Sequence, residues 1–166
     1  MIPTIETNRL RLVAPNKDAF ETYKKFYTDG SASKMYGGPI GIEQTWARLK
    51  ADVGSWHLLG FGVWVIQLKS NDSYVGTCGF WQGKEWPKEL TWWVLPEARG
   101  QGVATEASLA VLKHAYNVFN WEAVETYMND DNGVARALVE KLGGVKVRRQ
   151  QFNDGLSRDI YFLPKP

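Results

Sequence analysis

The sequence predicts an α/β (α+β) fold in which a mixed, mostly antiparallel sheet of about seven strands is flanked by helices. Three apolar runs rich in β-branched and aromatic residues, at 61–69, 73–81 and 90–95, follow one another closely, which is typical of antiparallel strands. An apolar pattern at helical spacing begins at Val103, and a further strand and helix follow it. The length of 166 residues fits a single domain, 1–166.

The N-terminal part of the chain supplies one strand and two helices. Residues 9–14 alternate between polar and apolar side chains, as a strand does. A helix over 15–29 starts at a proline followed by an asparagine, and both residues favour helix starts. Glycine and proline make 30–40 a loop, and apolar residues three and four apart predict a second helix over 42–56.

The C-terminal half alternates between helices and strands. A glycine-containing turn at 96–101 leads into a helix whose apolar face extends to Val118. This turn follows the fourth predicted strand, whereas a dinucleotide-binding fold has its glycine turn after the first strand, so the order argues against that fold. The remaining elements are a strand at 123–129, a helix at 134–142, and a hairpin of strands at 146–152 and 157–163.

Composition excludes several classes of function. The formal charge is only +2, which argues against non-specific binding to nucleic acid or to a membrane surface, so neither partner is expected. A solvated strand face is predicted for the short basic run of Lys146, Arg148 and Arg149. The single cysteine, Cys78, excludes an intrachain disulfide, and the two histidines lack the spacing of metal ligands, so no metal is expected.

The sequence also carries no signal for a membrane or for export. No segment reaches the roughly 18 consecutive apolar residues of a spanning helix. The N-terminus lacks the apolar core of a secretory signal. We therefore expect a cytoplasmic protein.

The stretch PEARGQGVATEA, at 96–107, joins a predicted strand to a predicted helix. Gly100 and Gly102 allow positive φ and let a ligand approach the main chain closely. The N–H groups from Arg99 to Thr105 converge at the start of a helix, where they have no partner inside the helix and the helix dipole is positive. The turn is therefore either a seat for a phosphate or pyrophosphate, with Arg99 adding a full charge, or an ordinary glycine-containing turn.

Several stretches in register resemble the GNAT superfamily of N-acetyltransferases. The series Arg99-Gly100-Gln101-Gly102-Val103-Ala104 resembles the acyl-CoA signature of that superfamily. Four longer stretches resemble its Rim type, the ribosomal-protein N-terminal acetyltransferases: ETNRLRL, YVGTCGFW, ELTWWVLPEARGQGVATEA and NDDNGVARALVEKLGG. The resemblance covers nearly the whole chain, and it is specific for the fold and for CoA binding but weak for the substrate.

The resemblance implies a GNAT-like fold in which two parallel strands, 90–95 and 123–129, splay apart to form an acyl-CoA cleft. Acetyl-CoA would be the acyl donor, with its pantetheine arm hydrogen-bonded to the main chain of the first strand. Asn132 matches an asparagine that contacts the cofactor, although it also fits a turn or helix cap. The other implied cofactor contacts are Trp93, Val94, Leu95, Arg99, Gly100, Gln101, Gly102, Val103, Ala104 and Thr105.

Glu89 is the catalytic residue that the resemblance implies. It matches a glutamate that acts as a base through water; its alternative role is a charge at a strand end. A carboxylate with an ordinary pKa of about 4.3 is a poor base, so burial must raise its pKa. The positions that usually hold the acid for the leaving thiolate read Ala135 and Val139. Other side chains that can donate a proton, or that belong to the core, are Cys78, Tyr127 and Tyr161.

The expected function is transfer of an acetyl group from acetyl-CoA to a primary amine, by direct attack in a ternary complex. The acceptor is a protein or peptide N-terminal α-amine or a small-molecule amine, and the enzyme acts as a monomer or homodimer. The alternative is a non-catalytic acyl-CoA-binding domain. Six tryptophans belong either to the core or to an apolar acceptor pocket that can hold a cationic amine: Trp46, Trp56, Trp81, Trp86, Trp92 and Trp93.

Overall fold

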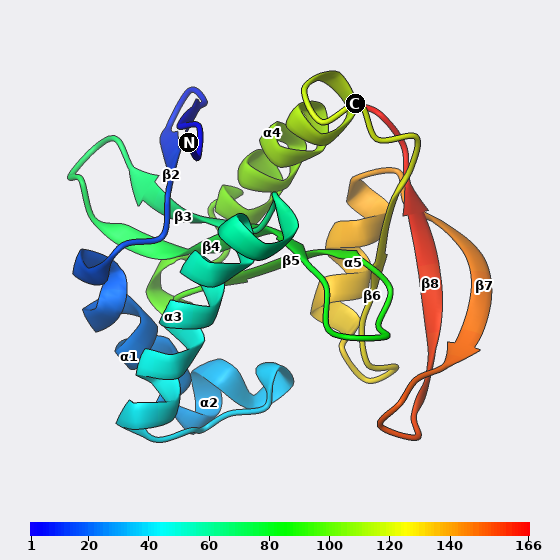
Figure 1. Cartoon of the computed structure of the whole chain (residues 1–166), viewed down its shortest axis with the longest axis horizontal. Helices are drawn as coiled ribbons and strands as arrows, with labels where there is room; N and C mark the ends of the chain where they lie inside the picture. The colour runs from blue at the N-terminus through cyan, green and yellow to red at the C-terminus, as the bar shows by residue number, and fades with distance from the viewer.

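Two antiparallel sheets form the framework of the computed structural model, which describes all residues of the chain (Figure 1). The first sheet has five strands in the order β1-β2-β3-β4-β5, and the second has three in the order β6-β8-β7. The strands are β1 (Ile5–Glu6), β2 (Leu10–Val13), β3 (Val63–Leu68), β4 (Tyr74–Trp81), β5 (Glu89–Val94), β6 (Val124–Tyr127), β7 (Val145–Gln151) and β8 (Ser157–Leu163).

Five α-helices accompany the sheets, and short 3-10 turns precede α1, follow α2 and follow β5. The long helix α4 connects β5, the last strand of the first sheet, to β6, the first strand of the second (Figure 1). The mixed α/β fold predicted from the sequence is confirmed. The helices are α1 (Phe20–Tyr27), α2 (Gly30–Ser33), α3 (Ile42–Leu59), α4 (Val103–Asn117) and α5 (Gly133–Lys141).

The five-stranded sheet is buried on both faces because its strands alternate between two cores. Along β3, Trp64 and Ile66 belong to the core that α4 covers, whereas Val65 belongs to the core that α1 and α3 cover. Side chains that alternate across a sheet in this way are expected where helices cover both faces. The two cores fix β5 from both sides, and β5 is the strand that borders the candidate site.

Local differences from the predicted elements have local causes. The helix expected over 15–29 opens as a 3-10 turn at Lys17–Ala19, and the Asn16 side chain accepts from Asp18 N. The loop expected over 30–40 contains the short helix α2, capped by Asp29. One turn of helix is too short to show a hydrophobic period, and the two residues of β1 are too few to show alternation.

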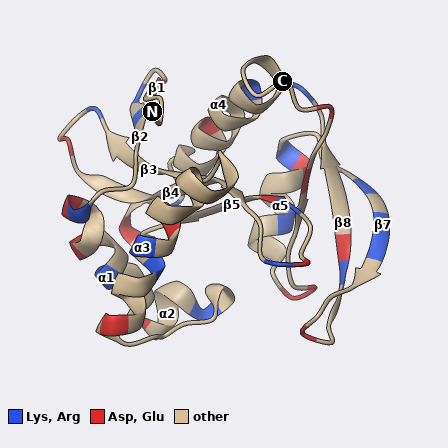
Figure 2. Cartoon of the chain, in the orientation of Figure 1, with Lys and Arg blue, Asp and Glu red and all other residues tan.

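Charges of both signs are spread over the surface (Figure 2). The basic residues of the exposed strand β7 face carboxylates, which fits a solvated strand face. Lys146 lies 3.1 Å from Asp159, and Arg149 lies 2.7 Å from Asp130. Among the helices, none combines the length and the apolar character needed to cross a bilayer.

An aromatic stack ties α1 to β5. Phe26 is fully buried and stacks on Trp93 with ring centroids 4.2 Å apart. The same Phe26 ring meets the Tyr36 ring edge-on at 5.3 Å. The stack therefore holds the strand beside the site and the segment after α2 in one packed unit.

We expect Phe26→Ala to lower the free energy of unfolding by about 3–5 kcal/mol, because it removes a fully buried ring and leaves a cavity. The matched control is Phe20→Ala on the same helix, which removes a half-buried ring that contacts Trp46, and we expect it to cost about 1 kcal/mol. Urea unfolding monitored by circular dichroism measures both. Equal costs for the two variants would contradict the packing described.

Candidate active site

The two sheets meet at β5 and β6 without a hydrogen-bonded ladder between these strands. Side chains join them at one end only. Thr126 Oγ1 donates to the Leu90 carbonyl at 2.8 Å, and the Tyr127 hydroxyl donates to the Pro87 carbonyl at 2.8 Å. Two cavities lie along these strands: one is lined by the joined residues Leu90 and Thr126, and the other by Val94 at the far end of β5.

The first cavity, which we call the turn-side cavity, has a volume of about 660 Å³. Its walls are the end of β5, the turn at 98–105 and the first half of α5. Val94, near the C-terminal end of β5, and Asn132, which follows β6, therefore line the same space. Leu90 lies near the start of β5 and Thr126 near the end of β6, so from this contact one chain continues to Val94 and the other to Asn132 on the same cavity, as expected for the splayed parallel pair that the resemblance implied.

The turn between β5 and α4 leaves a row of free donors. Gly100 and Gly102 adopt φ values of 76° and 77°, in the left-handed region that favours glycine. No N–H group from Gly100 to Thr105 donates to any protein acceptor, whereas the Arg99 N–H donates to the Pro96 carbonyl at 3.2 Å. The predicted group of converging donors is thus present, but it begins one residue later than expected.

Cationic side chains surround this turn. Lys34, Arg99 and Lys141 line the turn-side cavity, against the single carboxylate of Asp131. The Arg99 guanidinium is held in place, because its Nε donates to the Val94 carbonyl at 3.0 Å and its Nη2 to the Ala32 carbonyl at 3.1 Å. Free amides, a helix N-terminus and excess positive charge together suit a polyanion such as a diphosphate.

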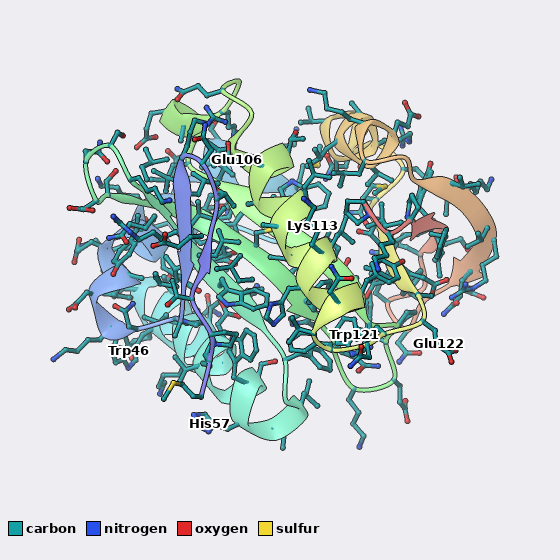
Figure 3. All side chains as sticks on the ribbon, turned by 90° about the horizontal axis from the view of Figure 1, so that it is seen from above. Trp46, His57, Glu106, Lys113, Trp121 and Glu122 are labelled. Carbon is teal, nitrogen blue, oxygen red and sulfur yellow. The ribbon has the colours of Figure 1, made fainter.

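A network of polar contacts, which we call the buttress, links the turn and the start of α4 to the residues between β1 and β2. The Glu106 carboxylate on α4 accepts from the Thr7 hydroxyl at 2.5 Å and from Arg9 Nε at 2.7 Å. Arg9 in turn donates to the Gln101 carbonyl at 2.8 Å. Figure 3 shows Glu106 at the end of α4 that lies beside the N-terminal strands. Burial raises the pKa of Glu106, but its contacts to Thr7 and Arg9 together outweigh burial and lower it.

The main chain of β5 faces the cleft at alternate residues. The Leu95 N–H donates to the carbonyl of Val75 in β4. Because the direction of the polar groups alternates along a strand, those of Trp93 also point toward β4. Trp92 and Val94 therefore turn theirs toward the open edge, and both residues line the turn-side cavity. Trp93, Val94 and Leu95 were predicted to contact the cofactor through their main chain. Of these three, only Val94 turns its main-chain polar groups toward the open edge. The Trp93 side chain packs on Phe26. The other residue whose main-chain polar groups face the open edge is Trp92.

The second cavity, the tryptophan-side cavity, has a volume of about 440 Å³ and contains Glu89. The Glu89 carboxylate forms no ion pair and no hydrogen bond with the protein. Burial raises its pKa well above the usual range, and only the charge of Arg158 opposes this shift. Arg158 is already paired with Asp154 at 2.6 Å. The site thus holds an uncompensated carboxylate with a raised pKa, as a base requires.

Aromatic rings form much of the wall around Glu89. Trp81 and Trp86 pack edge-to-face at 6.0 Å, and both line this cavity. Two of the six tryptophans singled out from the sequence lie elsewhere. Trp56 is buried against Trp64, and Trp46 is half-exposed against Phe20 (Figure 3). The remaining two, Trp92 and Trp93, also line the tryptophan-side cavity.

Only five residues line both cavities and so mark their junction: Met35, Tyr36, Trp92, Asn132 and Ala135. Asn132 caps α5, since its side chain accepts from Ala135 N at 3.2 Å, and it also faces both cavities. Tyr36 is a residue that sequence reasoning missed. It lies in the glycine- and proline-rich segment before α3, where no spacing rule or family motif indicates which side chain turns inward.

The side chains considered as proton donors lie away from the junction. Cys78 is fully buried 3.7 Å from the Ser108 hydroxyl, and burial raises the pKa of its thiol to about 12, although the Ser108 contact lowers it. The Tyr127 hydroxyl is bound to Pro87, and Tyr161 belongs to the core. His, Cys, Asp and Glu side chains form no group that could hold a metal ion.

Comparison with known proteins gives a consistent result. The family model of the acetyltransferase (GNAT) domain matches residues 9–145. No curated protein matches the chain by sequence. A crystal structure of an acetyltransferase from Agrobacterium tumefaciens is 28% identical and superposes with a TM-score of 0.89, covering 99% of this chain and 95% of that one.

Two further solved structures share the fold at lower identity. RimL, a ribosomal L7/L12 α-N-protein acetyltransferase in complex with coenzyme A, is 13% identical with a TM-score of 0.80, over 98% of this chain and 99% of that one. An acetyltransferase from Salmonella typhimurium that modifies the N-terminal serine of ribosomal protein L7/L12 is 12% identical with a TM-score of 0.81, over 96% and 98%.

We expect Glu106→Gln to lower the free energy of unfolding at neutral pH by about 1–3 kcal/mol, because it weakens charged hydrogen bonds that are partly buried. The folded-state pKa of Glu106 is lowered. The stabilisation is therefore complete above the ordinary glutamate pKa of about 4.3 and is lost as the pH falls through the lowered value.

Urea unfolding of both proteins from neutral to acid pH measures this difference. The control is Glu97→Gln, which removes a charge from the same turn, where the Glu97 carboxylate is exposed and unpaired. Equal stability of Glu106→Gln and Glu97→Gln would show that the buttress does not stabilise the turn.

Proposed function

Because the chain belongs to the acetyltransferase (GNAT) family, whose members take their acetyl group from acetyl-CoA, we propose that it transfers that group to a primary amine by direct attack. The acceptor that we propose is a peptide or protein N-terminal α-amine, or a small-molecule amine. The observation that carries the proposal is the row of unpaired main-chain N–H groups from Gly100 to Thr105, at the mouth of a cleft between two splayed strands.

The turn-side cavity suits the acyl donor. The free amides and the positive end of α4 would bind the diphosphate, and Lys34 and Lys141 would add charge around it. The pantetheine arm would then pair with the main chain of Trp92 and with the Val94 N–H, as an added strand does, because the Val94 carbonyl already accepts from Arg99. This path leads from the turn to the junction of the two cavities and would place the thioester there.

The tryptophan-side cavity suits the acceptor. Glu89 would take a proton from the attacking amine through a water molecule. At pH 7 only about one part in 10³ of a lysine-like amine is neutral, against about one in ten of an α-amine, so a base helps the first class more. The aromatic walls formed by Trp81, Trp86 and Trp92 favour an acceptor with an apolar body, and they can hold its amine as a cation before it loses the proton.

The two RimL-type relatives indicate one class of acceptor to test. Both of these enzymes acetylate the N-terminus of ribosomal protein L7/L12. A panel for this protein should therefore combine serine-starting peptides with aromatic and aliphatic primary amines, and the release of free CoA reports transfer. Tight binding of acetyl-CoA without CoA release for any amine would favour a non-catalytic acyl-CoA-binding domain.

We expect Gly102→Glu to abolish acetyl-CoA binding while the protein remains folded, because it places a carboxylate among the N–H groups that would hold the diphosphate. Isothermal titration calorimetry measures the affinity. Gly102→Gln is the matched control, since it imposes the same strain at positive φ and the same contact with Arg9 without the charge. Unchanged affinity in the glutamate variant would show that the diphosphate does not bind at this turn.

We expect Glu89→Gln to lower turnover and to flatten its rise with pH, with little change in acetyl-CoA affinity. The wild-type rate should rise as the pH passes through the raised pKa of Glu89, because only the carboxylate accepts a proton. Rates of CoA release across the pH range measure this with any acceptor found in the panel. Glu122→Gln, at an exposed position, is the control; a wild-type profile in Glu89→Gln would exclude Glu89 as the base.

A further inference from the structure

We propose that the hydroxyl of Tyr36 donates a hydrogen bond to the sulfur of CoA as it leaves as a thiolate. This inference rests on the proposed function, and it gives the site the donor that Ala135 and Val139 do not supply. Tyr36 belongs to the 3-10 turn Lys34–Tyr36, which follows α2 on the side of the cleft opposite α5.

The position of Tyr36 is the first reason. Of the five residues shared by the two cavities, it alone has a titratable side chain. The thioester must lie where the donor and the acceptor cavities meet, because the amine from one has to reach the carbonyl carbon in the other. A side chain at that junction is therefore within reach of the bond that breaks.

The packing of Tyr36 is the second reason. Its ring meets Phe26 edge-on, with an interplanar angle of 72°, and Phe26 stacks on Trp93 of β5. The ring is thus fixed relative to the strand that would carry the pantetheine arm. The hydroxyl itself forms no hydrogen bond with the protein, and because Tyr36 is only half-buried, this hydroxyl is accessible to a ligand. A held ring with a free hydroxyl is suited to bind a group that arrives with the substrate.

The surroundings of Tyr36 keep it protonated. Burial raises the pKa of its hydroxyl, and the nearby Tyr27, Glu89 and Cys78 raise it further, whereas Arg99 lowers it. Lys34, the one cation of the same 3-10 turn, lines the turn-side cavity. Tyr36 therefore remains a donor at every working pH, and it stabilises the thiolate through a hydrogen bond without giving up its proton.

The proposed step is balanced in atoms and charge. The nitrogen of the amine forms a bond to the thioester carbonyl carbon, the C–S bond breaks, and its electron pair goes to sulfur. The amine proton goes through water to Glu89, which leaves an amide and a thiolate held by the Tyr36 O–H. The thiolate, whose conjugate thiol has a pKa of about 8.5, then takes a proton from solvent on release, and Glu89 returns its proton to solvent.

The test is the pKa of the CoA thiol bound to the enzyme, measured by NMR with CoA labelled at the carbon beside sulfur. A hydrogen bond to the thiolate lowers that pKa, so we expect the bound thiol in Tyr36→Phe to titrate about one unit or more above that in the wild type. The control is Tyr74→Phe, because Tyr74 packs on the same core cluster as Tyr36 but lines neither cavity. The pKa of the bound CoA thiol in Tyr74→Phe should equal that in the wild type.

The second readout is turnover. We expect Tyr36→Phe to lower kcat by about 10- to 100-fold while the affinity for acetyl-CoA and the melting temperature stay close to wild type. A bound thiol with the same pKa in Tyr36→Phe as in the wild type would overturn the role of Tyr36 alone. A wild-type protein that binds no CoA would overturn the proposed function, and the role of Tyr36 with it.

Discussion

The missing ladder between β5 and β6 is the constraint on which the rest of the molecule depends. Two side-chain hydrogen bonds, from Thr126 and Tyr127, join the two sheets near Leu90, and beyond them the edge of β5 has no partner strand; only the Val94 carbonyl is engaged, by Arg99 Nε. An unpaired edge inside a protein is costly unless something completes it. Here the helices on both faces of the first sheet hold β5 in place, so the edge remains open for a ligand.

The two cavities differ in the charged and aromatic side chains that line them. The turn-side cavity combines free amides with Lys34, Arg99 and Lys141, which suits an anion. The tryptophan-side cavity is lined by aromatic rings and by charges of both signs, the carboxylates of Glu89 and Asp52 and the guanidinium groups of Arg48 and Arg158; of its two carboxylates, only Glu89 lacks a hydrogen-bonded partner. Burial of a carboxylate that has no partner in the protein destabilises a fold, and the raised pKa that results is the property that the proposed base Glu89 would use. In the proposed reaction, this arrangement would keep the two substrates apart and would bring their reacting ends together at one junction.

Much of this could be predicted from the sequence, because the relevant signals are local. Hydrophobic periods indicated most helices and strands, and the Gly100–Gly102 turn after a strand indicated a row of free amides. The remainder depends on tertiary structure. Which β5 residues face the cleft is set by pairing with β4, which no local pattern reveals. Arg99 resembled a free phosphate ligand, yet two carbonyls fix its guanidinium. Tyr36 comes from a segment without periodicity, so only the fold brings it to the junction.

The enclosed position of Cys78 has a practical consequence. The RimL complex contains coenzyme A joined to a cysteine by a disulfide, and such a bond requires a thiol that the ligand can reach. The only thiol of this chain is fully buried against α4 and lines neither cavity. Oxidised coenzyme A therefore finds no accessible thiol with which to form a mixed disulfide in the folded protein. A colorimetric thiol reagent would likewise detect free CoA with little background from the enzyme itself.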